Sequence, residues 1–206
     1  MSDKYQGAAA QASYGYGLQI GEQIERAAFD GLEVNAMLDG IRDVMQGEQP
    51  QLDEAVIGAA FQEITKQIEA KKAEQHKEAM AEGESFLAEN AKRPEINKTE
   101  TGLQYEVLVE GDGESPSATS KVQVHYEGTL ISGEVFDSSV QRGQPAEFPV
   151  NGVIKGWTEA LQRMKVGDKW KLYVPHELAY GSQGAGAAIP PFAALVFEVE
   201  LLAVLA

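Results

Sequence analysis

The spacing of apolar residues changes near residue 100, and no other feature of the chain constrains its fold as strongly. Between Val56 and Ile68 apolar side chains recur every three or four residues, which is the period of an α-helix. From Leu103 to Val109 they alternate, which is the period of a strand. Of the 8 prolines, Pro50 alone precedes Pro94, and the others follow residue 98. A helical front part therefore precedes a part built from strands and turns.

Three helices are expected in the front part. The apolar pattern predicts short amphipathic helices over residues 18–28 and 32–45, with breaks at 30–31 and 47–50. A long helix is expected to start at Asp53, a good N-cap, and to run without proline to about residue 90. Its residues 71–82 are polar on nearly every side, as in helices that cross solvent between packed units. The alternative is a frayed linker around Gly83.

The front part is too small to bury a core of its own, because about 65 residues form only a marginal domain. Gly17 and Gly21 each weaken a helix by roughly 0.8–1.0 kcal/mol relative to alanine. Close approach of a second helix would offset that cost, and Tyr14 and Tyr16 lie beside these glycines. We interpret residues 14–45 as a dimerisation module. Residues 71–82 would be an arm that has no apolar face to dock on its own chain and keeps two carboxyl-terminal domains apart. The alternative is a monomeric three-helix cap.

The part after residue 98 predicts an α+β fold. Strands are expected at residues 103–109, 121–130, 147–149, 169–174 and 195–204, and one short helix at 156–164. Such strands form an antiparallel sheet wrapped on the single helix. We therefore expect a helical dimerisation segment at residues 1–52, a long connecting helix and linker at 53–98, and the α+β domain at 99–206.

Charge and composition exclude several classes of function. The chain has 32 acidic and 17 basic residues, a net charge of −15, so its surface repels nucleic acid and anionic membranes. It has no cysteine and 3 histidines, so we expect no disulfide, no thiolate chemistry, no metal and no cofactor. The amino terminus lacks the features of a secretory signal, and no apolar run is long enough to span a membrane. We therefore expect a cytoplasmic protein without nucleic-acid or membrane partners.

Short motifs occur in a fixed order in the second part. They read Val-His-Tyr-Glu-Gly at 124–128, Val-Phe-Asp-Ser-Ser at 135–139, Val-Ile-Lys-Gly-Trp at 153–157, Ala-Tyr-Gly at 179–181 and Ile-Pro-Pro at 189–191. With this order and spacing the chain, from Thr101 to its end, resembles the FKBP-type peptidyl-prolyl cis-trans isomerases. The front part resembles, more loosely, the dimerising segment of the macrophage infectivity potentiator branch of that family. Within that branch, the chain is most similar to the small cytosolic bacterial dimers.

The resemblance implies a set of site residues. Substrate binding is expected from Tyr126, Phe136, Asp137, Arg142, Phe148, Val153, Ile154, Trp157, Tyr180, Ile189 and Phe197, and catalysis from Phe136, Asp137, Trp157 and Tyr180 among them. The proline ring would lie on Trp157, and Tyr180 and the backbone N–H of Ile154 would donate hydrogen bonds to substrate carbonyls. Asp137 would join a polar network with Arg142 and Tyr126, without acting as a general base. Without the resemblance, these residues look like a sheet core and its turns.

The resemblance also implies the reaction and its partners. We expect faster X–Pro isomerisation in folding proteins, with chaperone-like binding of unfolded or partly folded proline-containing clients by a V-shaped homodimer. The alternative is a non-catalytic chaperone or assembly factor that binds proline-containing segments. Macrolides of the rapamycin type are expected as a second ligand class, with a wider cleft and a more mobile loop than in some relatives because of Ala146 and the small residues at 181–188. Residues 99–206 alone are expected to isomerise short peptides at close to the full rate.

Overall fold

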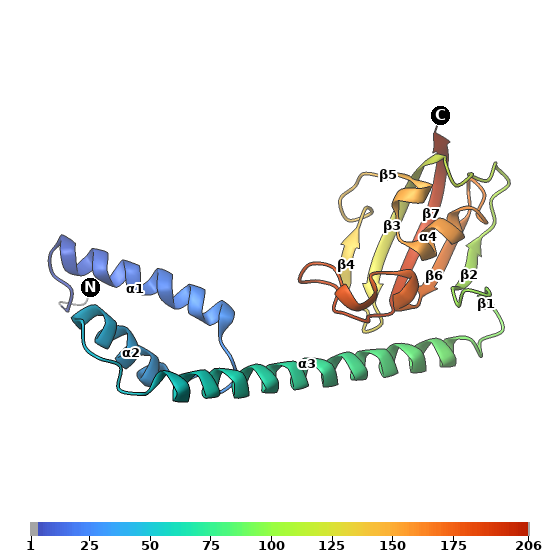
Figure 1. The fold of residues 1–206 in the computed structure, drawn as a ribbon. Coiled ribbons are helices and arrows are strands. Elements are labelled where there is room, and N and C mark those ends of the chain that lie inside the picture. The colour runs from blue at the N-terminus through green and yellow to red at the C-terminus, as the bar shows by residue number, and fades with distance from the viewer. Residues whose placement is uncertain (1–3, 206) are drawn as a thin grey trace. The chain divides into compact units, whose positions relative to one another are not determined.

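The structure, a computed structural model, describes residues 4–205. Its contacts divide the chain into two compact units, residues 1–72 and 73–206, and each is described by itself (Figure 1). Residues 1–3 and 206, the outer ends of the expected dimerisation segment and α+β domain, lie outside the described residues. The expected boundaries after residues 52 and 98 stay predictions. Within the described part, no helix combines the length and the apolar character needed to pass through a bilayer.

The first unit contains α1 (Ala8–Ala27), α2 (Val34–Gln46) and the first turns of α3 (Glu54–Asn90). α1 starts well before residue 18 because alanine, the best helix former, dominates its first turns. α2 ends at Gly47, whose φ of 73° breaks the helical backbone. α3 is one uninterrupted helix, so the continuous long helix is confirmed and the frayed linker is wrong.

The first unit has no buried hydrophobic core within one copy of the chain. None of residues 4–72 is buried. Large apolar side chains are exposed in all of its helices, including Tyr14 and Ile20 in α1, Met45 in α2 and Phe61 in α3. Met45 is 81% exposed and Phe61 64%. The amphipathic pattern thus leaves an apolar surface that these helices do not cover themselves.

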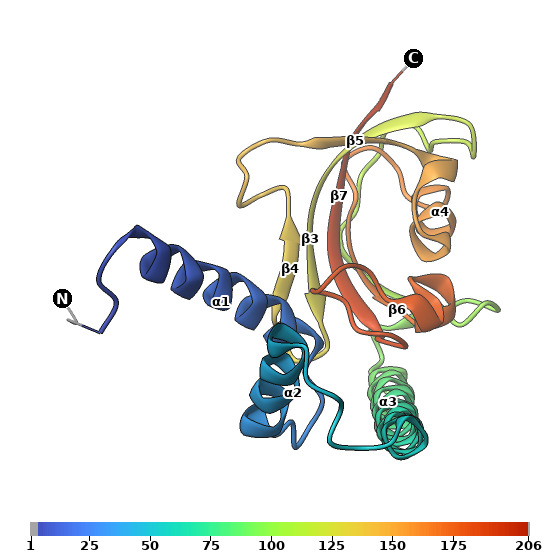
Figure 2. The ribbon, with the colours of Figure 1, turned by 60° about the vertical axis from the view of Figure 1, so that its left-hand side comes forward.

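The second unit is an antiparallel sheet with one short helix, which confirms the expected α+β fold. The strands are β1 (Asn97–Lys98), β2 (Gln104–Val109), β3 (Lys121–Leu130), β4 (Val135–Ser138), β5 (Ala146–Pro149), β6 (Lys169–Val174) and β7 (Leu195–Leu205). Their order is β1-β2-β6-β7-β3-β4, and β5 pairs with the first residues of β3. Figure 2 shows α4 (Lys155–Leu161) on the inner side of the curved sheet. The sequence pattern predicts neither β1 nor β4.

Alternation along β3 builds the core beneath α4. Val122, Val124 and Tyr126 are buried, whereas the residues between them are partly exposed. The buried side chains form one apolar cluster with Trp157 and Leu161 of α4. The sheet therefore brings Tyr126 to the start of α4, where Trp157 lies.

The second half of α3 docks on this sheet. Gly83 and Asn90 are buried, and a Cβ added to Gly83 would lie 3.2 Å from the Ala194 Cβ. Asn90 Nδ2 donates a 2.9 Å hydrogen bond to Gln104 Oε1, and Gln104 Nε2 donates to the Leu87 carbonyl at 2.9 Å. This part of α3 is therefore integral to the second unit.

The expectation that residues 71–82 have no face for docking on their own chain is wrong. His76, Ala79 and Met80 are partly buried, and their spacing places them on one side of the helix. The physical reason is that α3 docks through small and polar residues, which carry little of the hydrophobic signal that marks a buried helix face.

Candidate active site

One cavity of about 420 Å³ gathers most of the predicted site residues. It lies between β3, β4, β5, β7, the start of α4 and the loop after β6. Its lining consists of Tyr126, Phe136, Asp137, Phe148, Gly152, Val153, Ile154, Trp157, Tyr180 and Phe197. The predicted substrate-binding residues are therefore all in the lining except Arg142 and Ile189, and the sequence does not predict Gly152.

Trp157 gives the cavity an apolar floor and is itself 4% exposed. The rings of Tyr126, Phe197 and Phe148 meet the indole at 84°, 79° and 85°, with centroid separations of 5.2, 5.3 and 6.0 Å. Such edge-to-face contacts are the favoured geometry for aromatic pairs. They hold the indole in one orientation, so that it gives the cavity a rigid apolar floor.

The cavity wall requires a glycine at position 128 in β3. A Cβ added there would lie 2.6 Å from the Phe136 ring and 2.8 Å from the Phe197 ring. These two rings pack edge to face, with centroids 5.6 Å apart. A larger residue at 128 would displace these two rings of the cavity lining, so this glycine sets the shape of the wall.

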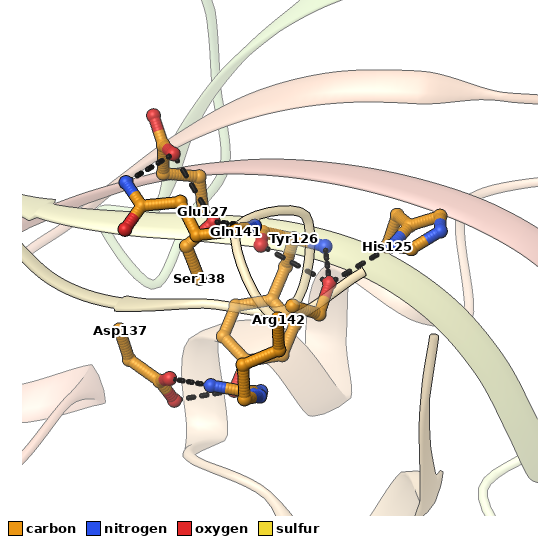
Figure 3. A network of polar contacts seen from close by, with 8 residues as sticks. His125, Tyr126, Glu127, Asp137, Ser138, Gln141 and Arg142 are labelled. Atoms are coloured by element: carbon orange, nitrogen blue, oxygen red, sulfur yellow. Dashed lines mark hydrogen bonds and ion pairs between the residues drawn. The ribbon is translucent and has the colours of Figure 1, made fainter. Parts of the chain in front are cut away.

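A polar network joins Asp137, Tyr126 and Arg142 at the rim (Figure 3). Asp137 accepts hydrogen bonds from Tyr126 Oη and Arg142 Nη1, and Arg142 Nη2 donates to Tyr126 Oη at 3.0 Å. The guanidinium also lies 5.6 Å from the centroid of the Tyr126 ring. Arg142 thus reaches the site through its two partners, although it does not line the cavity.

A second set of contacts anchors the turn after β4 to β3 (Figure 3). The Ser139 backbone N–H donates to the Tyr126 carbonyl at 2.9 Å, and the Ser139 hydroxyl accepts from the Tyr126 N–H at 2.7 Å. That hydroxyl also lies 3.1 Å from His125 Nδ1, and Ser138 Oγ donates to Glu127 Oε2 at 3.1 Å. Sequence reasoning missed Ser139, because a short polar run of this kind reads only as a turn or a helix cap.

The protonation states at the rim follow from burial and these hydrogen bonds. Burial raises the pKa of Tyr126, and its hydrogen bond to Asp137 raises it further. Burial would also raise the pKa of Asp137, but the hydrogen bonds from Tyr126 and Arg142 outweigh it and hold that pKa below its ordinary 3.8. Burial and the charge of Asp137 raise the pKa of Tyr180. At neutral pH Asp137 is therefore ionised and both tyrosines keep their protons.

Two donors at the cavity are free to bind a ligand. Within residues 4–205, neither the Tyr180 hydroxyl nor the backbone N–H of Ile154 donates to another residue, and Tyr180 is 40% exposed. Across the same residues, no group of three or more His, Asp or Glu side chains is placed to hold a metal ion. The site therefore offers an apolar floor and hydrogen-bond donors to carbonyl oxygens.

Ile189 is not among the residues that line the cavity, and its role in substrate binding stays a prediction. Its side chain is 6% exposed and belongs to the core. Its backbone N–H and carbonyl pair with Ala185 at 3.1 and 2.9 Å. The motif places Ile189 near the site, but the burial that removes it from the lining depends on the sheet beneath the loop.

Both units match known families. Residues 112–202 match the family described as FKBP-type peptidyl-prolyl cis-trans isomerase, and residues 9–107 match the family described as the domain amino terminal to FKBP-type peptidyl-prolyl isomerase. The FKBP-type 22 kDa peptidyl-prolyl cis-trans isomerase of Escherichia coli is 53% identical over 196 residues, which cover 95% of each chain. The peptidyl-prolyl cis-trans isomerase Mip of Coxiella burnetii is 41% identical, over 93% of this chain and 85% of that protein.

Solved structures show the same likeness. The crystal structure of FkpA from Escherichia coli matches with a TM-score of 0.75 and 34% identity, over 97% of this chain and 98% of that chain. A peptidyl-prolyl cis-trans isomerase from Pseudomonas syringae matches with a TM-score of 0.59 and 41% identity, over 62% of this chain and 94% of that chain.

Proposed function

The chain belongs to the FKBP-type peptidyl-prolyl cis-trans isomerases, and we propose that it isomerises X–Pro bonds in unfolded clients that a homodimer holds between two sites. The observation that carries the proposal is the cavity, which combines the Trp157 floor with the free donors of Tyr180 and Ile154. The dimer rests on a separate observation, the uncovered apolar surface of the first unit.

Isomerisation of an X–Pro bond is a rotation with a barrier of about 18–20 kcal/mol, and no covalent bond breaks. As the amide twists it loses resonance, so its carbonyl becomes less polar and its nitrogen more pyramidal. An apolar cavity binds this twisted amide more tightly than the planar one, while donors hold the neighbouring carbonyls in place. A barrier lowered by about 8 kcal/mol gives roughly a millionfold acceleration.

Asp137 serves this reaction by orienting its neighbours. Its carboxylate is ionised and already accepts hydrogen bonds from Tyr126 and Arg142, and the rotation moves no proton. A general base is therefore not needed. The carboxylate fixes the Tyr126 ring, which in turn packs edge-on against Trp157 with centroids 5.2 Å apart. Asp137, Phe136, Trp157 and Tyr180 are the residues to which we assign catalysis.

A second copy of the chain would cover the apolar surface of the first unit. Exposed apolar patches of this kind mark interaction sites, and symmetric dimers are the commonest soluble assembly. Among the described residues, a Cβ added to Gly17 or Gly21 would meet no atom of another segment within 4 Å, so one copy gives no reason for glycine in α1. Close approach of a partner helix provides one. Two linked cavities would then raise the effective concentration of a site for a long client.

Sedimentation of the full chain at micromolar concentration tests the dimer, and two rate measurements test its role. We expect a dimer that dissociates when Gly17 or Gly21 is replaced by leucine, with an unchanged rate on a short X–Pro peptide and a much lower rate on a slowly refolding protein. A wild-type monomer contradicts the dimer. Equal rates of dimer and monomer on the refolding protein contradict its role with clients.

The same assays separate the isomerase from a non-catalytic chaperone. A chaperone would suppress client aggregation but leave the exchange rate of an X–Pro peptide at its uncatalysed value. We also propose macrolides of the rapamycin type as ligands, because the lining around Trp157 and Phe197 is rich in aromatic rings. Competitive inhibition of the peptide reaction supports this, and the absence of inhibition at high micromolar macrolide contradicts it.

A further inference from the structure

The loop that carries Tyr180, residues 179–194, has few large side chains with which to hold its place. Residues 181–188 contain no apolar side chain larger than alanine. Apart from two prolines, the larger apolar residues that follow Tyr180 in this active-site loop are Ile189, which is buried, and Phe192, which is partly buried. The position of the loop therefore depends on these two anchors.

Phe192 has a backbone conformation that phenylalanine adopts only when its surroundings impose it. Its φ is 62°, and no other non-glycine residue in the described part of the chain has a positive φ. Favourable contacts must offset this strain. The ring packs against His76 of α3, with centroids 5.1 Å apart, and against His176 of η2 (His176–Leu178), with centroids 5.2 Å apart. We call these three residues the aromatic clamp.

α3 supports the same loop at a second point. Gly83 lies so close to Ala194 that a Cβ added to it would be 3.2 Å from the Ala194 Cβ and 3.7 Å from its nitrogen. Figure 2 shows the green part of α3 beside the loop that leads into β7. The second half of α3 is therefore a surface on which the active-site loop rests.

One hydrogen bond connects the aromatic clamp to the cavity. The Phe192 N–H donates to the Gly181 carbonyl at 2.8 Å, and Gly181 directly follows Tyr180. We propose that Phe192 is a positioning residue for catalysis, gripped by His76 and His176 so that its backbone holds Gly181 and keeps Tyr180 at the cavity. The docked half of α3 then belongs to the catalytic machinery as well as to the connection between the two units.

Amide hydrogen exchange in the full chain tests directly whether the two histidine rings hold Phe192 in place. Replacing His76 with alanine keeps the helix and removes one ring contact, so the Phe192 amide should exchange about two- to tenfold faster, the range expected for one aromatic pair. Lys77→Ala, an exposed neighbour on α3, is the matched control and should leave that exchange unchanged. His76→Phe restores a ring and should restore protection. Unchanged exchange in His76→Ala overturns the proposal.

Activity on a short X–Pro peptide tests the consequence. Phe192→Ala loses both ring contacts and keeps the strain, so kcat/KM should fall about tenfold. Phe192→Gly loses the same contacts, but glycine adopts a positive φ freely, so it should retain more activity than Phe192→Ala. A purely packing role predicts no advantage for glycine. Wild-type kcat/KM in both variants, or no advantage of glycine over alanine, overturns the proposal.

This proposal rests on the proposed isomerase activity. Different results would contradict the activity and the positioning role of Phe192. Wild-type protein without activity on the peptide contradicts the activity. An active wild type whose His76 and Phe192 variants behave like Lys77→Ala contradicts the aromatic clamp alone.

Discussion

Replacing Asp137 with asparagine tests whether this carboxylate orients the cavity. Asp137 accepts hydrogen bonds from Tyr126 and Arg142, and Arg142 donates to the same Tyr126 oxygen at 3.0 Å. Asparagine has nearly the same shape but no charge, so the hydrogen bond from Tyr126 loses its charge assistance and Arg142 loses its ion-pair partner. The Tyr126 ring then loses its tether at the edge of the cavity.

The magnitude follows from the exposure of the partners. A hydrogen bond to a charged group contributes about 1.5–3 kcal/mol and a neutral one about 0.5–1.5, so the Tyr126 bond should weaken by about 1 kcal/mol. The side chains of Arg142 and Asp137 are 51% and 42% exposed, so solvent screening limits the ion pair to about 1 kcal/mol or less. We expect the free energy of unfolding at pH 7 to fall by about 1–2 kcal/mol.

The pH dependence has a definite sign. The folded protein holds the pKa of Asp137 below its ordinary 3.8, so the unfolded chain binds this proton more readily than the folded one. The stabilisation is therefore complete above the unfolded pKa and disappears as pH falls through the lower, folded pKa. Urea unfolding of wild type and Asp137→Asn should differ most at pH 7, and the difference should shrink below about pH 4.

Glu147→Gln is the matched control for activity. Glu147 has a similar exposure, 43%, and pairs with Lys121 at 2.6 Å, but it does not line the cavity. On a short X–Pro peptide, kcat/KM should fall about tenfold in Asp137→Asn, the equivalent of roughly 1.4 kcal/mol, and stay unchanged in Glu147→Gln. Wild-type kcat/KM in Asp137→Asn refutes the orienting role, and a stability difference that stays constant down to pH 3 refutes the pKa reasoning.

Other predictions concern the floor, the wall and the docking of α3. Trp157→Ala should cost about 3–5 kcal/mol of unfolding free energy and most peptide activity; a stable variant with full activity would show that the indole is not the floor. Gly128→Ala should displace the Phe136 ring, 2.6 Å from the new Cβ, and lower kcat/KM, whereas unchanged kinetics would show that the wall tolerates the methyl group. Asn90→Leu leaves the buried oxygen of Gln104 without its donor and should cost about 1–3 kcal/mol in urea unfolding; no loss would show that this contact is dispensable.

The docking of α3 also changes which fragment can be expected to work. Residues 99–206 lack His76, Gly83 and Asn90, so that fragment loses one of the three residues of the aromatic clamp and leaves the Gln104 side chain without its donor. A fragment that starts at Ala73, where the contacts divide the chain, keeps all of them. We expect residues 73–206 to approach the full rate on short peptides and residues 99–206 to be slower and less stable, as parallel peptide assays and urea unfolding would show.

The change in the spacing of apolar residues near residue 100 predicted the helical front part, the long helix and the sheet wrapped on one helix. This was possible because amphipathic periodicity depends only on residues that are close together in the sequence. The common site of Phe136, Trp157 and Tyr180 was predicted in a different way, by the resemblance of their motifs to a known family and not by periodicity. β4 could not be predicted from the sequence pattern, because its residues become a strand only by pairing with β3, as Asp137 does with Gly128.

Only the tertiary structure decided which small and polar residues would be buried. Gly83, Asn90 and Ser139 have no hydrophobic signal, yet each is enclosed because a segment distant in sequence meets it: Ala194, Gln104 and β3, respectively. The sequence by itself determined the apolar stripes of the first unit, but the fold of one copy leaves them exposed. Periodicity predicts that one face of a helix or strand is apolar. The segment that covers this face lies far away in the chain or belongs to another chain, so no local sequence pattern predicts it.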